Sequence, residues 1–277
     1  MYRVSKVLNN NGVIAIDMEE NQEYVILGKG VGFGKKVSQR FDKPAECTLY
    51  RLEQETERGS AKELVKGIEP EYLEIADEIL TEAQKVFGDS VDRGILFPLA
   101  DHISFAVARI RRNEQISNPL TEDIKVLFYS EFKVAETLKT ILKKRLQIAI
   151  DDHEVGYVAL HIHSAIGDEK VSVAMQTARA VRVCIDMIEK ATGKPIDVLS
   201  LSYNRLMNHM KYMVARASTG EKLNLDMNEY MLDQYPQAYE STAEICKNLE
   251  GCIGHKLDET EIGYLAMHIQ RVYKDAV

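Results

Sequence analysis

The chain has 277 residues, of which 45% are hydrophobic and 28% are charged, so it can bury more than one core and should fold into more than one domain. Its formal net charge of −8 argues against indiscriminate nucleic-acid binding by the whole molecule, so any such site must be local. No apolar run approaches the roughly 20 residues that span a bilayer, and the N-terminus lacks the apolar centre of a signal peptide. We therefore expect a cytoplasmic protein without membrane insertion, whose four scattered cysteines are reduced.

Residues 1–57 have the pattern of a small antiparallel β-sheet. Short β-rich runs alternate with turns rich in Asn and Gly, and they predict four strands at residues 4–8, 13–16, 24–27 and 47–52. A sheet of this length has little core of its own. Pairing with a second copy into a homodimer is therefore expected.

Two turns of this sheet offer a local site for RNA. One is the asparagine run at 9–11, followed by Gly12, and the other is GKGVGFGKK at 28–36, which holds three lysines and no acid. Glycines let backbones approach closely, lysines neutralise phosphates, and Phe33 can stack on an unpaired base. The alternative is a pair of ordinary hairpin turns in which Phe33 plugs the sheet. A nucleotide-binding P-loop is less consistent, because the segment does not fit its motif and no helical pattern follows.

From about residue 62 onward the apolar spacing is helical and contains a duplication. The segment EVGYVALHIH at 154–163 returns as EIGYLAMHIQ at 261–270, and ADHISFAVAR at 100–109 returns as MNHMKYMVAR at 207–216. Both echoes lie 107 positions apart (209 − 102 and 268 − 161). This spacing fits a duplicated domain better than a solenoid repeat. Pro98 is expected at a helix start. We predict two all-α bundles at about 66–168 and 172–277, joined by a charged linker at 167–170.

Each predicted bundle holds a pair of histidines in the same register: His102 and His161 in the first, His209 and His268 in the second. Each lies beside an apolar stripe, so we expect it at the rim of a core, partly exposed. These histidines are either structural residues or a functional pair that the duplication retained.

Three functions compete for the histidines. Metal binding would use His161 with His163, but on a helix these face apart, and the second copy has Gln270 instead. Nucleophilic catalysis would require a repeated Ser or Cys constellation, which is absent from the sequence. The third is phosphoryl acceptance by a neutral imidazole, with Arg109 and Arg216 either pairing with the phosphoryl group or standing as solvated cations.

The motifs KVLNNN, LGKGVGFGKK, DHISFAVAR/NHMKYMVAR and EVGYVALHIH/EIGYLAMHIQ, in this order, closely resemble the BglG/SacY/LicT family of transcriptional antiterminators. The GKGVGFGKK form is most similar to the family's glucose-type branch. The resemblance covers the whole chain and implies a co-antiterminator RNA-binding domain at 1–57, followed by two phosphotransferase regulation domains (PRDs). It implies no enzyme activity and no cofactor.

By this resemblance, the N-terminal dimer binds a hairpin in leader mRNA and prevents an overlapping terminator from forming. The implied RNA-binding residues are Lys6, Asn10, Asn11, Gly28, Lys29 and Phe33. The implied phosphorylation sites are His102, His161, His209 and His268, with a sugar-specific permease acting on the first domain and the phosphocarrier HPr on the second.

The sequence departs from the family pattern in two places. Gly12 adds a residue after the asparagine run, which leaves the contacts of the run open, and Phe128 and Phe132 stand where the second copy has Tyr235 and Tyr239. Two alternatives remain open at this point: a histidine-metal hydrolase of helical fold, and a protein-binding regulator without RNA recognition.

Overall fold

The computed structural model describes residues 1–53, 55–56, 59–114, 116–167, 170–193, 195–197 and 200–275. The chain forms two compact units, one from residues 1–121 and 128–171 and the other from residues 122–127 and 172–277. The predicted linker at 167–170 lies partly outside the described residues, between helix α7 (Asp152–Gly167) and helix α8 (Val171–Thr192). Each unit is described by itself below.

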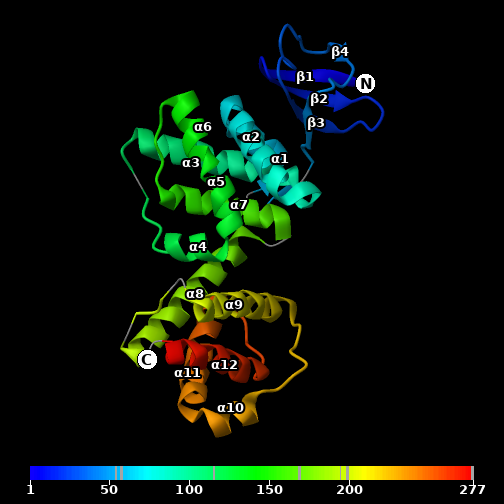
Figure 1. The fold of residues 1–277 in the computed structure, drawn as a ribbon. Coiled ribbons are helices and arrows are strands. Elements are labelled where there is room, and N and C mark those ends of the chain that lie inside the picture. Colours follow the sequence, from blue (N-terminus) through cyan, green and yellow to red (C-terminus); the bar gives the residue numbers. More distant parts are fainter. Residues whose placement is uncertain are drawn as a thin grey trace. The chain divides into compact units, whose positions relative to one another are not determined.

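The first unit begins with an antiparallel sheet, drawn in blue in Figure 1. Its strands follow the order β4-β1-β2-β3-β5. They are β1 (Tyr2–Asn9), β2 (Gly12–Asp17), β3 (Glu23–Leu27), β4 (Arg40–Phe41) and β5 (Thr48–Arg51). The four predicted strands are present, whereas the two-residue β4 was missed because so short an edge strand has no apolar alternation to detect. A small hairpin of β6 (Glu55–Thr56) and β7 (Gly59–Ser60) follows the sheet.

The sheet buries residues on both faces. One face packs a core around Val13, Ala15, Ile26 and Val31. On β5 the ring of Tyr50 makes an edge-on contact with Phe97 of the helical part, with 6.3 Å between ring centroids. The sheet therefore has a covered face within this unit, which supplies burial that its own few strands cannot.

The Tyr50 contact includes a half-buried polar network. The Tyr50 hydroxyl donates to the Asp77 carboxylate, and Arg93 donates to the Tyr50 hydroxyl (2.7 Å) and to Asp77 (2.6 Å). Burial and the Asp77 charge raise the pKa of Tyr50 well above its usual value, so the phenol stays protonated and donates. The network ties the sheet to the helices that follow.

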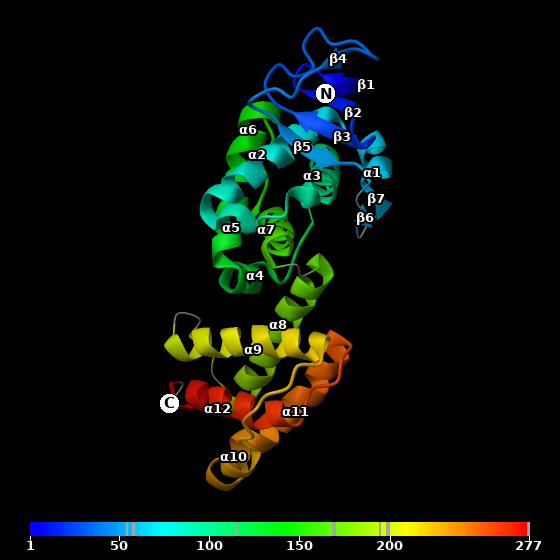
Figure 2. The same ribbon diagram turned by 90° about the vertical axis from the view of Figure 1, so that its right-hand side faces the viewer.

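The helices of the first unit follow the sheet, and Figure 2 shows the strands of the sheet over α2 and α3. They are α1 (Ala61–Gly67), α2 (Pro70–Phe87), α3 (Leu96–Arg111), α5 (Tyr129–Ala135), α6 (Thr137–Leu146) and α7 (Asp152–Gly167), with short 3-10 turns at Gly88–Ser90 and Arg93–Ile95. Helix α2 begins with Pro70, whose missing N–H costs nothing in a first turn, and Gly88 ends it at φ +67°. Helix α3 starts at Leu96 and not at the predicted Pro98, which lies in the first turn, where no donor is lost either.

The second unit is a helical bundle. It contains α8 (Val171–Thr192), α9 (Leu201–Thr219), α10 (Asn228–Gln234), α11 (Pro236–Ile253) and α12 (Thr260–Asp275), and it includes most of α4 (Thr121–Leu127). Ser200 caps α9 by accepting a hydrogen bond from the Tyr203 N–H, and Gly220 ends the helix in the left-handed conformation. A core drawn from α8, α9, α11 and α12 holds the bundle together. The fold class expected from the sequence, a small sheet followed by helical domains, is confirmed.

Candidate functional site

The asparagine run forms a tight turn between β1 and β2. Asn10 and Asn11 are the two turn residues, and Asn9 pairs with Gly12 across the hairpin. The Asn9 Oδ1 accepts a hydrogen bond from the Asn11 N–H at 2.8 Å, which closes the turn through a side chain. Gly12 is therefore the first residue of β2, and a Cβ there would lie 3.0 Å from Leu27 Cδ2. The extra residue is accommodated by the ladder and leaves the turn at two residues.

The glycine-rich loop closes onto this turn. The Gly32 N–H donates to the Asn10 carbonyl at 3.0 Å, and the Gly28 N–H donates to the Asn11 carbonyl at 2.9 Å. The Gly30 N–H donates to the Asn11 Oδ1 at 3.0 Å. A Cβ on Gly32 would lie 2.0 Å from the Asn9 carbonyl oxygen, so only glycine allows this approach. The two turns that the sequence singled out are one hydrogen-bonded surface.

This surface leaves three side chains pointing to solvent. Phe33 is 73% exposed, while Val31 of the same loop is buried in the core of the sheet, so Val31 and not Phe33 plugs the sheet. Asn10 and Lys29 are also exposed, and neither side chain has a hydrogen-bond or ion-pair partner in the described part of the chain. Lys6 is exposed on β1, and no described contact joins it to the loop. An exposed amide, cation and aromatic ring stand together on one rigid loop.

The same turn contacts helix α2. The Asn9 Nδ2 donates to Glu74 Oε1 at 2.6 Å, and the Asn11 Nδ2 donates to Glu74 Oε2 at 3.2 Å. Arg145 pairs with Glu74 at 3.3 Å and with Glu78 at 3.0 Å. The side-chain oxygen of Asn11 is therefore bonded to the loop and its side-chain nitrogen to Glu74. The side-chain oxygen and nitrogen of Asn10 are both available.

The first histidine pair lies between α3 and α7. The rings of His102 and His161 have centroids 5.4 Å apart. The Glu154 carboxylate lies between His102 and a cation: its Oε2 is 3.5 Å from His102 Nε2, and its Oε1 accepts from Arg109 Nη2 at 2.8 Å. Burial would raise the pKa of Glu154, but hydrogen bonds and charge from His102 and Arg109 lower it below its usual value. The tie between the helices is therefore ionic and buried.

The second unit repeats this arrangement between α9 and α12. The rings of His209 and His268 are stacked at 4.8 Å, and Glu261 Oε2 lies 3.6 Å from His209 Nε2. Arg216 donates to Glu261 twice, from Nε at 2.6 Å and from Nη2 at 2.9 Å. The planar guanidinium thus binds the carboxylate in a two-pronged geometry that lysine cannot match.

The structure corrects two expectations about these residues and adds two residues that were missed. His102, His161 and His209 are each less than a tenth exposed, and only His268 is partly exposed as predicted. The stripe pattern placed them at the rim because it ignores the neighbouring helix that covers them. Arg109 and Arg216 are not solvated cations on the helix surface, since each is paired with a buried glutamate. Glu154 and Glu261 were missed, although both open the repeated E-x-G-Y motif, and that repetition was the available signal.

Burial also sets the charge of the second histidine pair. It lowers the pKa of His209 to about 3, with further lowering by the charges of His268 and Arg216. It lowers the pKa of His268 to about 4, with further lowering by Arg271 and Arg205. Both rings are therefore neutral near pH 7, and each retains a nitrogen lone pair.

His163 is separated from His161 as the helical spacing predicted. Its Nδ1 lies 2.9 Å from Glu131 Oε1, and its ring contacts Phe128 with centroids 4.3 Å apart. His161 instead lies against His102. Among the described residues, no three His, Cys, Asp or Glu side chains are arranged to hold a metal ion.

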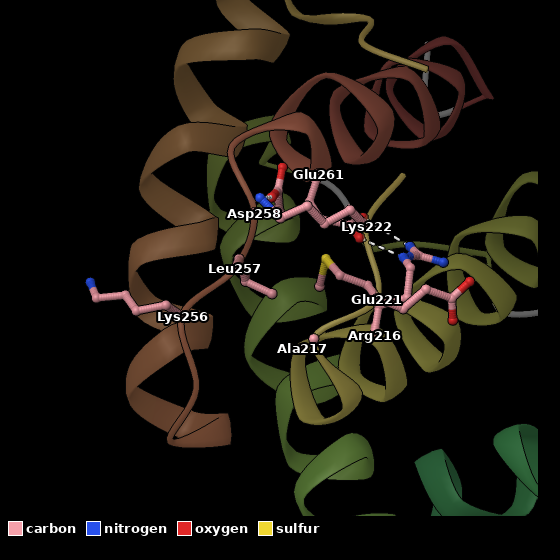
Figure 3. Close-up of a pocket in the computed structure, with 10 residues that line it drawn as sticks. Arg216, Ala217, Glu221, Lys222, Lys256, Leu257, Asp258 and Glu261 are labelled. Carbon is pink, nitrogen blue, oxygen red and sulfur yellow. Dashed lines mark hydrogen bonds and ion pairs between the residues drawn. The ribbon is translucent and has the colours of Figure 1, made fainter. Parts of the chain in front are cut away.

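A pocket of about 230 Å³ opens beside the Arg216–Glu261 pair in the second unit. Figure 3 shows this ion pair at one side of the pocket, with Lys222 and Asp258 at another. Lys222 Nζ and Asp258 Oδ2 are 3.1 Å apart. Two pairs of its charged lining residues, Arg216 with Glu261 and Lys222 with Asp258, thus bind one another. None of the helices among the described residues has both the length and the apolar composition of a membrane span.

Comparison with known proteins matches three segments of the chain to two domain families. Residues 2–59 match the CAT RNA binding domain, and residues 77–165 and 182–272 each match the PRD domain. Protein GlcT of Staphylococcus haemolyticus is 30% identical over 97% of this chain and 95% of its own length. Transcription antiterminator LicT of Bacillus subtilis is 28% identical over 99% of this chain and its whole length. The crystal structure of GlcT CAT-PRDI superimposes with a TM-score of 0.52 at 28% identity, covering 60% of this chain and 98% of that one.

Proposed function

Since the chain belongs to the BglG/LicT family of RNA-binding transcription antiterminators, which phosphorylation by the phosphotransferase system regulates, we propose how its own residues divide this work. The observation that carries the proposal is the closure of the glycine loop on the asparagine turn. The proposed bounds are an RNA-binding domain at 1–57 and regulation domains at 66–168 and 172–277. The chain acts as a regulator and not as an enzyme.

The RNA site is the surface made by the two turns. Asn10 and Phe33 meet bases in the loop of a leader-mRNA hairpin, because an exposed amide and an exposed ring suit unpaired bases. Lys29 neutralises a phosphate. Asn11 and Gly28 act through the backbone and the side-chain bonds that set the loop, and Lys6 adds positive charge on β1.

The protein acts as a homodimer, in which two copies of the surface face one RNA hairpin. What supports a dimer is the family resemblance, which implies that the N-terminal domain works as a pair; the burial that the sheet needs is already supplied by the helices that follow it. Binding stabilises a hairpin that overlaps a terminator, and transcription continues.

The regulatory sites are His102, His161, His209 and His268, which take a phosphoryl group from HPr or from a sugar-specific permease. A neutral imidazole has the lone pair that this transfer needs, and the lowered pKa values of His209 and His268 provide it. Glucose is the sugar proposed, from the likeness to Protein GlcT.

The buried glutamates explain how a phosphoryl group would change the fold. A group carrying nearly two negative charges beside Glu261 repels that carboxylate and competes for Arg216. The Arg216–Glu261 pair joins α9 to α12, so its loss loosens the packing of these helices. Glu154 and Arg109 give α3 and α7 the same sensitivity.

The RNA assignment is tested with a gel shift of the full chain on its operon's leader transcript. Phe33→Ala and Lys29→Ala should each weaken binding by about 1–3 kcal/mol, roughly 5-fold to 150-fold. Lys43→Ala, an exposed lysine outside the loop, is the matched control. Tight binding by both loop variants would refute the assignment.

Phosphorylation is tested by incubating the chain with phosphorylated HPr or permease and mapping acid-labile phosphate. Label on the four histidines is expected, lost one by one on His→Gln substitution. Absence of label from all four would remove the regulatory part of the proposal.

A further inference from the structure

Two arginines lie close in sequence to the second histidine pair and take no part in the neighbouring Arg216–Glu261 ion pair. Arg205 lies on α9 four residues before His209, and Arg271 lies on α12 three residues after His268. Residues three or four apart share one face of a helix, so each arginine is on the side of its helix that carries a histidine. Because the rings of His209 and His268 stack on each other, the two arginines lie in the same region, around the histidine pair.

Both arginines are free. Each is exposed, and within the described residues neither makes a hydrogen bond or an ion pair. Arg216 differs, because both prongs of its guanidinium are bound to Glu261. Their charges nevertheless act on His268: after burial, Arg271 and Arg205 are the groups that lower its pKa to about 4. Two unpaired cations therefore lie near enough to an uncharged ring for their charge to act on it.

Of the two rings, His268 is the accessible one. It is partly exposed, whereas His209 is 9% exposed and its Nε2 is buried against Glu261. The Nδ1 of His268 is itself buried and finds no hydrogen-bond partner among the described residues. A phosphoryl donor can therefore be directed only at its Nε2.

The chemistry at this nitrogen is a simple exchange. The Nε2 lone pair attacks the phosphorus of a phosphohistidine on a carrier protein, and a new N–P bond forms as the donor's N–P bond breaks. The electron pair of the broken bond returns to the donor imidazole, which takes up a proton, and the ring of His268 releases one. The product carries a dianion on His268, for which guanidinium groups are the preferred partners.

The first unit lacks both arginines. At the same offset of 107, Arg205 corresponds to Pro98 (205 − 107) and Arg271 to Ser164 (271 − 107), neither of which carries charge. A phosphoryl group on His161 would therefore find no cation at these two positions. It would still be repelled by the Glu154 carboxylate, which lies against the neighbouring ring of His102. Phosphorylation of a histidine should therefore have different effects in the two units.

We infer that the second regulation domain holds its phosphoryl group on His268 between Arg205 and Arg271, and that the first domain lacks this holder because Pro98 and Ser164 stand at the equivalent positions. This inference rests on the proposed phosphorylation. Arg205 and Arg271 are positioning residues, since they would hold the product without taking part in the bond exchange. Holding the dianion would draw α9 and α12 together in the second domain, whereas the first would loosen.

The test uses the full chain with Arg205→Gln, Arg271→Gln and the double substitution, labelled by a phosphohistidine carrier protein. Arg179→Gln, an exposed arginine on α8 without a described partner, is the matched control. The measurements are occupancy of His268, mapped under alkaline conditions, and the half-life of the phosphoryl group after the donor is removed. The urea midpoint before and after labelling is the third.

The double variant should lose occupancy or half-life at His268 by at least about tenfold, since each charge-assisted hydrogen bond supplies a comparable factor. Labelling should raise the urea midpoint of the native chain and not that of the double variant. Arg271→Lys should recover part of the loss, because it restores the charge without the fork. In the first domain, Ser164→Arg should lengthen the half-life of label on His161.

Label on His268 that is equally stable in the double variant, or label confined to His209, would overturn the inference while leaving phosphorylation control intact. A chain that takes no label on any histidine would overturn both. Far-ultraviolet circular dichroism checks that the variants fold, which the exposure of both arginines leads us to expect.

Discussion

Asn9 of the sheet donates a 2.6 Å hydrogen bond to Glu74 of helix α2, and the second oxygen of Glu74 accepts from Asn11. A carboxylate of the helical part thus occupies the turn that we propose for RNA. Phosphates approaching this turn would meet a negative charge, and Asn11 is not available to a base while it is bound. If the turn binds RNA as proposed, this contact would oppose the binding.

Replacing Glu74 by Gln should therefore strengthen RNA binding. The loss of one negative charge and of charge-assisted bonds predicts a gain of about 0.5–1.5 kcal/mol, or roughly 2-fold to 12-fold in Kd. A gel shift of the full chain measures it. Glu78→Gln is the matched control, because Glu78 pairs with Arg145 and not with the asparagines. An equal gain in both variants would mean that general charge, and not the contact, is responsible.

Asn10 and Asn11 should behave differently when replaced by Ala. Asn10 has an exposed and unbonded side chain in the described structure, so Asn10→Ala should weaken RNA binding while the urea midpoint stays unchanged. Asn11→Ala removes the acceptor of the Gly30 N–H and should lower both RNA affinity and the unfolding free energy, the latter by about 1 kcal/mol. Equal stability of the two variants would contradict this division.

Gly32→Ala should disrupt the loop. A Cβ at this position would lie 2.0 Å from the Asn9 carbonyl oxygen, so the loop must move off the turn. We expect a loss of several kcal/mol of stability and no measurable RNA binding. Gly34→Ala is the control: its Cβ meets open space, and its φ of +67° should cost only about 1 kcal/mol. Similar effects of the two substitutions would show that the close approach is unimportant.

The second histidine pair should make stability depend on pH. Because the pKa values of His209 and His268 in the folded chain are about 3 and about 4, below the unfolded value near 6.5, the unfolded state binds more protons between these limits. Stability should be full above about pH 6.5 and fall as the pH drops, down to about 4 for His268 and to about 3 for His209. The slope is at most about 1.4 kcal/mol per pH unit for each ring. Urea midpoints at several pH values measure it, and a His209→Gln/His268→Gln variant should flatten the curve in this window.

Glu261→Gln should destabilise the second unit. Arg216 has a side chain only 15% exposed, and the substitution leaves its charge without a charged partner. Breaking a buried pair on one side costs about 3–5 kcal/mol. Glu250→Gln, which loses an exposed pair with Lys256, should cost less than about 1 kcal/mol. Urea unfolding followed by circular dichroism compares the two, and equal losses would show that burial does not matter here.

The sequence by itself determined those features that leave a periodic or repeated pattern in the chain. Alternation predicted the main strands of the sheet, the 107-residue echo identified two equivalent bundles, and the repeated register picked out the histidines. The helical spacing also separated His161 from His163, because local geometry alone sets which way neighbouring side chains point.

Only the tertiary structure decided which side chains contact one another. Val31 and Phe33 are separated by a single residue, and the way the loop closes on the asparagine turn decides that Val31 and not Phe33 enters the core of the sheet. The buried glutamates beside His102 and His209, and the contact of Glu74 with Asn9, join residues 52, 52 and 65 positions apart (154 − 102, 261 − 209 and 74 − 9). Such pairs leave no period in the chain, because they follow from the packing of separate elements and not from the geometry of one.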